Sequence, residues 1–243
     1  PVDLLDYDTF SLTQMAYLWT AIEHNKSLIF AGGTASGKTT SMNAVSMFIP
    51  PKAKVITIED TREISLPQEN WIPGTTREGV GGEEGGDDID MYELLRAALR
   101  QRPEYIVVGE IRGKEAETLF QAMNTGHTTY STMHAETVDA AIGRLTNPPI
   151  NVPKQMITAL DIICIQNQIR FTDDNGDVQN VRRNEETREI VGLRDNGQFQ
   201  NRRPFQWDAE TDTFIQSLED SYVLSRISEE NGWTPEDKQR ELQ

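Results

Sequence analysis

A glycine-rich stretch, FAGGTASGKTT at residues 30–40, combines residue types that can bind a triphosphate. Residues 32–39 fit the pattern G-x-x-x-x-G-K-[ST], in which glycines let backbone N–H groups converge on phosphate oxygens. In this pattern Lys38 reaches the β and γ phosphates, and the hydroxyl of Thr39 binds Mg²⁺. A flexible loop that matches by chance is the alternative. We predict a phosphate-binding loop whose contacts come from Gly33, Thr34, Ala35, Ser36, Gly37, Lys38, Thr39 and Thr40.

A cluster of carboxylates follows the second apolar segment of the chain, in the sequence IEDTRE. Glu59, Asp60 and Glu63 would lie at the carboxyl end of a strand, where α/β proteins bind their ligands. There one carboxylate can polarise a water molecule, and others can hold metal-bound water. Acidic residues also decorate ordinary surface loops, so this segment alone is not specific.

Two later segments add groups that suit a nucleotide site. The sequence IVVGEIR is an apolar strand ending in an acid, and this acid, Glu110, would lie near Mg²⁺, directly or through water. The sequence TGHTTYSTMH places His127 and His134 at the two ends of another strand. A histidine beside a γ phosphate can donate a hydrogen bond and report the nucleotide state, whereas a lone histidine is more often a packed or surface residue.

The elements that must position these groups follow from the periodicity of apolar residues. Strands alternating with helices indicate a mostly parallel sheet with helices on both faces. After residue 162 the spacing of turn signals changes and predicts antiparallel strands, followed by terminal helices. The expected strands are 27–31, 54–59, 105–108, 129–133, 162–171, 178–183, 189–193 and 213–215, and the expected helices are 12–23, 39–48, 91–101, 115–124, 137–145, 152–160, 218–231 and 235–243. A long acidic, glycine-rich loop is expected at 74–90.

Composition narrows the class of protein further. Asp and Glu total 39 against 23 Lys and Arg, for a net charge of −16, and lysines are only seven of the basic residues. This pattern is typical of haloarchaeal proteins, because high salt screens the self-repulsion; an acidic mesophilic protein is the alternative. The charge argues against non-specific binding to DNA or anionic lipid. The single cysteine, Cys164, excludes an internal disulfide and a cysteine-based zinc site, and no apolar run is long enough to span a bilayer.

The order of the four motifs resembles that of the secretion ATPase superfamily. These proteins are the hexameric motors of type II and type IV secretion, type IV pili and the archaellum, and their motifs are called Walker A, Asp box, Walker B and His box. The resemblance covers about residues 1–165, and KSLIFAGGTASGKTT, Asn70-Trp71 and RLTNPPINVP are most similar to the archaeal branch. Walker A here reads GGTASGKT, where many bacterial members have Pro-Thr-Gly in the middle, and the bacterial tetracysteine module is absent.

The resemblance implies a RecA-like P-loop NTPase fold that uses ATP and Mg²⁺. Residues 1–165 would form the ATPase core and 166–243 a strand-rich and helical extension, while the family's N-terminal domain is missing and the start at Pro1 suggests a cut fragment. By resemblance, Lys38 and Thr39 bind phosphate and Mg²⁺, and Glu63 orients the attacking water with Glu59 and Asp60 as supports or rivals. Glu110 is the Walker B acid and a further Mg²⁺ contact, and His127 and His134 form the His box. The γ phosphate also needs positive charge, for which the chain offers Arg77, Arg144 and Arg112.

The implied protein is a homohexamer on the cytoplasmic face of the cell membrane. It would bind a polytopic membrane platform protein, drive assembly or secretion of pilin-like subunits, have no membrane span of its own and bind no specific nucleic acid. Two other functions stay open. A DNA-directed RecA-like ATPase would need a basic groove, which the net charge of −16 disfavours. A scaffold that binds nucleotide without turnover would not need Lys38, Glu63 and Glu110 together.

Overall fold

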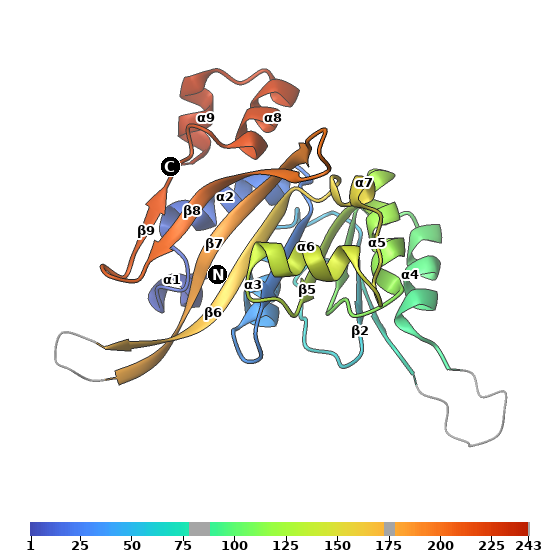
Figure 1. The fold of residues 1–243 in the computed structure, drawn as a ribbon. Coiled ribbons are helices and arrows are strands. Elements are labelled where there is room, and N and C mark those ends of the chain that lie inside the picture. The colour runs from blue at the N-terminus through green and yellow to red at the C-terminus, as the bar shows by residue number, and fades with distance from the viewer. Residues whose placement is uncertain (78–87, 173–177, 243) are drawn as a thin grey trace.

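The computed structural model describes residues 1–77, 88–172 and 178–242. One nine-stranded sheet runs through these residues in the order β3-β2-β4-β5-β1-β6-β7-β8-β9 (Figure 1). The strands are β1 (Leu28–Gly32), β2 (Val55–Glu59), β3 (Trp71–Thr75), β4 (Tyr105–Val108), β5 (Thr128–Met133), β6 (Ile162–Thr172), β7 (Val178–Leu193), β8 (Phe199–Asp208) and β9 (Thr213–Gln216).

The sheet is parallel from β3 to β6 and antiparallel from β6 to β9. The central strands β1, β2, β4 and β5 are buried along their whole length, because helices cover both of their faces. Their residues are mostly apolar, with threonines and a serine in β5 and one buried carboxylate, Glu59, at the end of β2. The predicted fold class, a mostly parallel α/β sheet with an antiparallel C-terminal extension, is confirmed.

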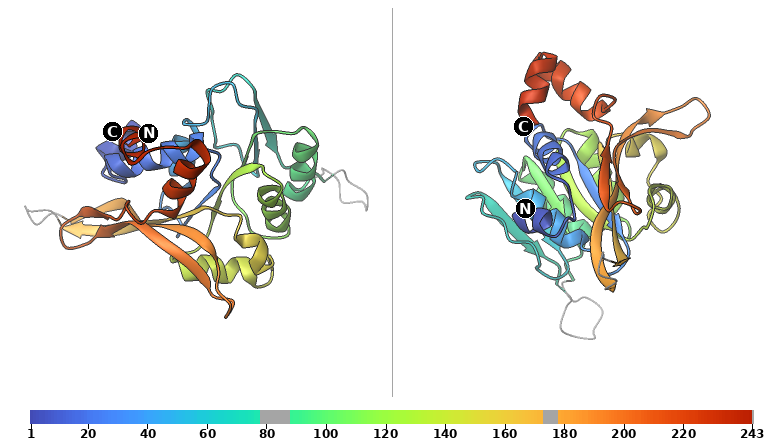
Figure 2. Two further views of the ribbon diagram at one scale, coloured as in Figure 1. Left: turned by 90° about the horizontal axis from the view of Figure 1, so that it is seen from above. Right: turned by 90° about the vertical axis from the view of Figure 1, so that its left-hand side faces the viewer.

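Two groups of helices sandwich the sheet (Figure 2). Leu95, Phe120 and Leu145 pack one group against one face, and Leu18 and Met42 pack the other group against the opposite face. The first group is α4 (Met91–Arg100), α5 (Glu115–Asn124), α6 (Val138–Thr146) and α7 (Lys154–Ile157), and the second includes α1 (Val2–Asp6), α2 (Leu12–Glu23), α3 (Lys38–Ser46) and α8 (Tyr222–Asn231), with α9 (Pro235–Glu241) at the C-terminal end. Among the helices of the described residues, none has the length and apolar character needed to cross a bilayer.

Several elements differ from the sequence-based expectation. The strand β3 was not expected because its sequence, WIPGT, contains a proline, which lacks a backbone donor. Since β3 lies at one edge of the sheet, only one of its sides has to pair. The helix α7 is shorter than the predicted 152–160, and α1 was missed. Part of the predicted acidic loop, residues 78–87, lies outside the described residues.

The C-terminal extension also differs in detail. The predicted strands 178–183 and 189–193 are one long strand, β7, and β8 was not expected. β7 contains the polar sequence RRNEETRE, which lacks the alternation that predicts a strand. Hydrogen bonds to β6 and β8 on its two sides hold it extended, with register shifts at two positions against β8.

A buried carboxylate ties this extension to the rest of the fold. Glu189 Oε1 accepts hydrogen bonds from Tyr17 Oη at 2.7 Å and Ser221 Oγ at 2.5 Å, and its Oε2 accepts one from the Tyr222 amide at 2.7 Å. The side chain of Glu189 is fully buried, so these three hydrogen bonds replace the water that would otherwise solvate its carboxylate. It therefore links β7 with α2 and the start of α8. The predicted division of the chain at residue 165, within β6, stays a prediction.

Candidate functional site

The phosphate-binding loop lies where the sheet ends and a helix begins. It leaves the carboxyl end of β1 after Gly32 and enters α3 at Lys38. A Cβ atom on Gly32 would lie 2.1 Å from the carbonyl oxygen of Gln166 on the neighbouring β6, so only glycine fits this position. Gly37 has a φ of +90°, which turns the chain into the first turn of α3. The helix therefore presents its N-terminal amides to the loop.

The side chain of Lys38 lies inside this loop. Its Nζ donates a hydrogen bond to the carbonyl oxygen of Gly33 at 2.6 Å, and the residue is only 8% exposed. Ser36 Oγ donates to the same carbonyl at 2.9 Å. Burial lowers the pKa of the Lys38 ammonium, and the nearby charge of Glu110 opposes this shift. The loop thus holds a cation at its centre, while Thr34, Ala35 and Thr40 are exposed.

A cavity of about 240 Å³ opens beside the loop, at the carboxyl ends of β2 and β4. Parallel strands bring their carboxyl ends to one edge of the sheet, and so residues 59–63 and 110 meet the start of α3 there. The residues lining this cavity, which we call the carboxylate cavity, are Thr39, Glu59, Asp60, Thr61, Glu63, Gly109, Glu110 and Arg112. The structure therefore brings together five of the residues singled out in the sequence as acids or metal ligands: Thr39, Glu59, Asp60, Glu63 and Glu110.

Glu59 and Glu63 occupy different environments in the carboxylate cavity. Glu59 is 3% exposed, and its Oε1 accepts hydrogen bonds from the amides of Glu63 at 2.9 Å and Ile64 at 3.0 Å. Its Oε2 is buried and has no hydrogen-bond partner among the described residues. Burial raises the pKa of the Glu59 carboxyl, and the two amides oppose this shift. Glu63, in contrast, is exposed, and Asp60 accepts a hydrogen bond from Thr76 Oγ1 at 3.2 Å.

Glu110 also has one unused oxygen. Its Oε2 pairs with Arg112 Nη2 at 2.6 Å, whereas its Oε1 lies 3.4 Å from His134 Nε2 and accepts no hydrogen bond among the described residues. Two buried carboxylate oxygens, Glu59 Oε2 and Glu110 Oε1, are thus left without donors in one cavity. Such oxygens, with the hydroxyl of Thr39, are ligands that Mg²⁺ takes directly or through water, so this donor set fits the ion.

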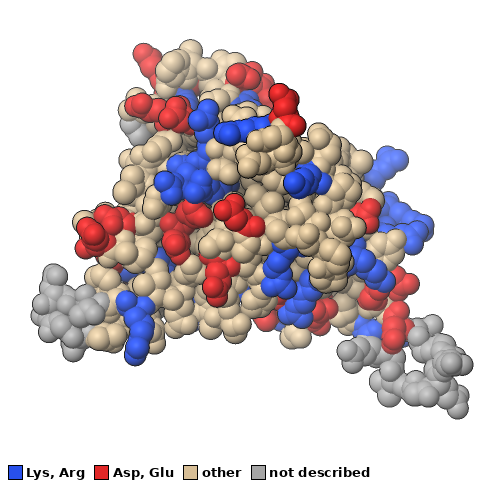
Figure 3. Space-filling model, in the orientation of Figure 1, with Lys and Arg blue, Asp and Glu red and all other residues tan. Residues whose placement is uncertain are grey.

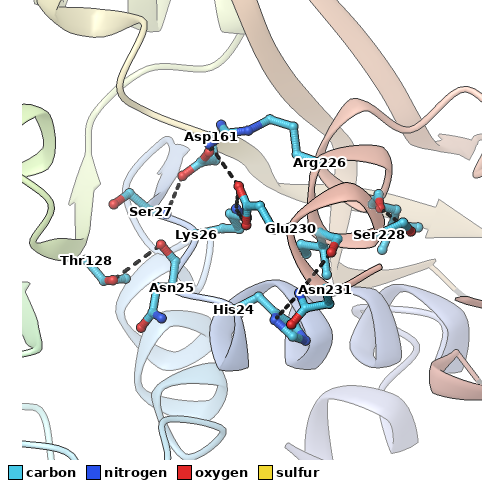
Figure 4. A network of polar contacts seen from close by, with 12 residues as sticks. His24, Asn25, Lys26, Ser27, Thr128, Asp161, Arg226, Ser228, Glu230 and Asn231 are labelled. Atoms are coloured by element: carbon cyan, nitrogen blue, oxygen red, sulfur yellow. Dashed lines mark hydrogen bonds and ion pairs between the residues drawn. The ribbon is translucent and has the colours of Figure 1, made fainter. Parts of the chain in front are cut away.

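The structure does not bring the two histidines together. His134 follows β5 and lies beside Glu110. His127 precedes β5, at the amino ends of the parallel strands and thus on the side of the sheet away from the carboxylate cavity. Seven residue steps along an extended strand separate the Cα atoms of the two histidines by about 23 Å. Figure 4 shows Thr128, the residue after His127, near a polar network that includes Lys26, Asp161 and Glu230. The Thr125 hydroxyl, 3.3 Å from Nδ1, is the contact of the His127 ring.

The three arginines expected near the γ phosphate lie at different places around the site. Arg112 pairs with Glu110 and lies 3.9 Å from Asp60. Arg77 lines an adjoining cavity of about 360 Å³, which Asp60, Glu110 and Arg112 also line. Arg144, on α6, donates from Nη1 to the carbonyl oxygen of His134 at 2.8 Å.

One further side chain contacts the phosphate-binding loop without having been expected. Arg182 Nε, on β7, donates a hydrogen bond to the carbonyl oxygen of Ala35 at 2.9 Å. Arg182 is 147 residues away from Ala35 in sequence, and although it lies in the predicted strand 178–183, no motif connected that strand with the loop.

The family model described as "Type II/IV secretion system protein" matches residues 2–207, which include the loop, the carboxylate cavity and most of the sheet. The chain belongs to this family. The prediction that it resembles the secretion ATPases is therefore confirmed at the level of the family.

Relatives of this secretion-system protein come from archaea and bacteria. An uncharacterized protein of Methanocaldococcus jannaschii is 48% identical over 230 residues, which are 94% of this chain and 82% of that protein. The type IV secretion system protein PtlH of Bordetella pertussis is 44% identical over 135 residues, 54% of this chain and 38% of that one. The solved structure of the VirB11 ATPase of the Brucella suis type IV secretion system has a TM-score of 0.57 at 24% identity, covering 73% of this chain and 53% of that one. The last comparison shows a shared fold.

Proposed function

We propose that this secretion-system protein hydrolyses ATP at the phosphate-binding loop and the carboxylate cavity. The observation that carries the proposal is the position of two buried carboxylate oxygens that accept no hydrogen bond among the described residues, on Glu59 and Glu110, in a cavity that Thr39 also lines. Buried carboxylates without donors suit a site that receives metal-bound or attacking water. The VirB11 protein of similar fold is described as an ATPase, which agrees with the proposal.

The residues of this site have separate roles in the proposed reaction. Lys38 exchanges the carbonyl of Gly33 for phosphate oxygens, and the glycines and helix N-terminus supply amide donors. Thr39 and Glu110 would hold Mg²⁺, which would supply positive charge to the phosphate oxygens during the reaction. Glu63 orients the attacking water, and Glu59 holds the main chain of Glu63 in place.

The groups around the cavity complete the proposed site. His134, which faces Glu110, reports the state of the terminal phosphate, and His127 has no part in it because it lies at the other edge of the sheet. Arg77 and Arg112 line the cavity that adjoins the site, and Arg144 donates a hydrogen bond to the main chain of His134. Each of the three side chains is exposed, and each is a candidate for the positive charge that the γ phosphate needs.

The proposed work of the protein is to power a membrane-bound secretion or assembly system from the cytoplasmic face. A homohexamer would use ATP hydrolysis to assemble or secrete pilin-like subunits through a polytopic platform protein. The similarity to an archaeal protein supports the archaeal branch, and the charge of −16 supports a halophilic source. On the face drawn in Figure 3, the described basic and acidic side chains form separate small patches, so this face offers no continuous basic groove for nucleic acid.

Nucleotide binding tests the first step of this proposal. We expect the chain to bind ATP and ADP in the presence of Mg²⁺ and AMP at least ~100-fold more weakly. AMP lacks the β phosphate and with it about two charge-assisted contacts, each worth roughly 1.5 kcal/mol. Calorimetric titrations with the three nucleotides, repeated with EDTA, measure both effects, and EDTA should weaken ATP binding. Equal affinity for AMP and ADP, or no binding of either ATP or ADP, would contradict the proposal.

A further inference from the structure

The loop that would bind phosphate is held from outside by a residue of the C-terminal extension. Arg182 Nε donates to the carbonyl oxygen of Ala35 at 2.9 Å. The arginine side chain also passes closely over Gly37, since a Cβ atom built there would lie 3.0 Å from Arg182 Cδ. Arg182 thus contacts the middle and the end of the loop.

The pairing of the strands places Arg182 there. Gly32, the last residue of β1, is paired with Gln166 of β6, and two residues further along β6 Gln168 is paired with Arg182 of β7. Arg182 therefore lies just past the end of β1, where the loop leaves the sheet. A side chain at this register can reach over the loop from the side opposite the carboxylate cavity.

The main chain of the loop needs such a restraint. Ala35 has a φ of +60°, in the left-handed region, where residues with a Cβ atom are about 1–2 kcal/mol less stable than in their usual conformations. Ala35 is also exposed, so packing does not fix its peptide group. The hydrogen bond from Arg182 fixes the direction of its carbonyl and, with it, the orientation of the amide that follows.

A second contact joins the same part of the extension to α3. The buried side chain of Gln166 donates from Nε2 to Ser41 Oγ, two residues beyond Thr39. The strands β6 and β7 thus hold the loop at Ala35 and the helix after it at Ser41, on either side of the residues expected to bind phosphate and Mg²⁺.

We propose that Arg182 is a positioning residue of the nucleotide site, which keeps the phosphate-binding loop in its receptive conformation through the hydrogen bond from Nε to the Ala35 carbonyl. This inference rests on the proposed function for its effect on nucleotide affinity. The effect on the conformation of the loop does not depend on any nucleotide.

Three substitutions separate the hydrogen bond from the charge. In Arg182→Gln, the amide nitrogen lies the same number of bonds from the main chain as the arginine Nε, so it can donate to Ala35 without carrying a charge. In Arg182→Lys, a methylene group takes the place of Nε, and the charged Nζ lies one bond beyond that position. Arg182→Ala removes both groups. Arg202→Ala, at an exposed arginine of β8, is the matched control.

Hydrogen exchange of the Ser41 amide, which donates to the carbonyl oxygen of Gly37 at the end of the loop at 2.9 Å, is the first measurement and is made on the nucleotide-free chain. We expect this amide to exchange about 10-fold faster in Arg182→Ala and Arg182→Lys, as the loss of one charge-assisted hydrogen bond that holds the loop allows. Arg182→Gln and Arg202→Ala should exchange at nearly the wild-type rate. Affinity for ADP, measured by titration, should follow the same order, with a loss of about 10-fold in the alanine and lysine variants.

Two outcomes would overturn the inference. If Arg182→Lys keeps wild-type behaviour and Arg182→Gln does not, the charge acts on the nucleotide directly and the hydrogen bond to Ala35 is incidental. If Arg182→Ala exchanges and binds ADP as Arg202→Ala does, Arg182 has no role in the loop. A wild-type chain that binds no ADP would instead refute the proposed function, and the exchange measurement would still decide the role of Arg182.

Discussion

Replacing Lys38 by alanine is expected to abolish nucleotide turnover, with a loss of at least ~1000-fold, while the chain stays folded. The ammonium of Lys38 lies inside the phosphate-binding loop on the carbonyl of Gly33, where alanine can supply no positive charge to a phosphate. Burial lowers the pKa of Lys38, which means that at neutral pH the charged side chain is less favourable in the folded chain than in the unfolded chain. Removing it should therefore leave thermal stability almost unchanged.

The rate of phosphate release and the thermal unfolding midpoint check both halves of this prediction. Lys52→Ala is the control, because Lys52 is an exposed lysine in the turn before β2, away from the loop. Undiminished hydrolysis in Lys38→Ala would show that this loop does not bind the phosphates of the hydrolysed nucleotide. A collapse of the unfolding midpoint would instead show that Lys38 is needed for folding.

Glu63→Gln is expected to keep ATP binding and to lose hydrolysis by about 100-fold or more. Glutamine has nearly the shape of glutamate, but it carries no charge and cannot accept the proton of the attacking water. The side chain of Glu63 is exposed on the carboxylate cavity, so the substitution should not disturb the packing of β2. Binding by titration and turnover by phosphate release, measured on the same preparation, separate the two effects.

Glu59→Gln is the matched comparison, because Glu59 lines the same cavity as Glu63 and its buried Oε2 accepts no hydrogen bond among the described residues. Its amide oxygen can still accept the hydrogen bonds from the amides of Glu63 and Ile64. We therefore expect a smaller loss of turnover, of about 10-fold, from the altered position of Glu63. A complete loss in Glu59→Gln with a mild effect in Glu63→Gln would assign the water-orienting role to Glu59.

The sequence predicted the central part of the fold because there each signal is local and strong. The strand β4 and the helix α5 have the expected bounds, since a buried parallel strand is a short apolar run and α5 keeps a clear helical period. The helix α2 also has its expected bounds, with Ser11 and Gln14 making the capping box that the sequence indicated. The convergence of Thr39, Glu59 and Glu110 followed from the rule that α/β proteins bind their ligands at the carboxyl ends of parallel strands.

The remaining features depend on contacts between distant residues. The strand β3 and the polar segment that joins the two predicted strands within β7 lack the usual pattern, and hydrogen bonds from neighbouring strands decide their conformation. His127 comes directly before β5 in sequence, and because of the direction of that strand it lies at the amino ends of the parallel strands, away from the carboxylate cavity. Arg182 reaches the loop only through the register of β6 and β7. Residue spacing alone contains none of this information.

The rate of phosphate release from ATP by the native protein, with Mg²⁺ and with EDTA, tests most directly that the loop and the carboxylate cavity form a hydrolytic site. We expect steady release with Mg²⁺ that EDTA stops and that Lys38→Ala and Glu63→Gln abolish. Tight binding of ATP without any release of phosphate under these conditions would contradict hydrolysis and leave a nucleotide-binding scaffold as the function of this secretion-system protein.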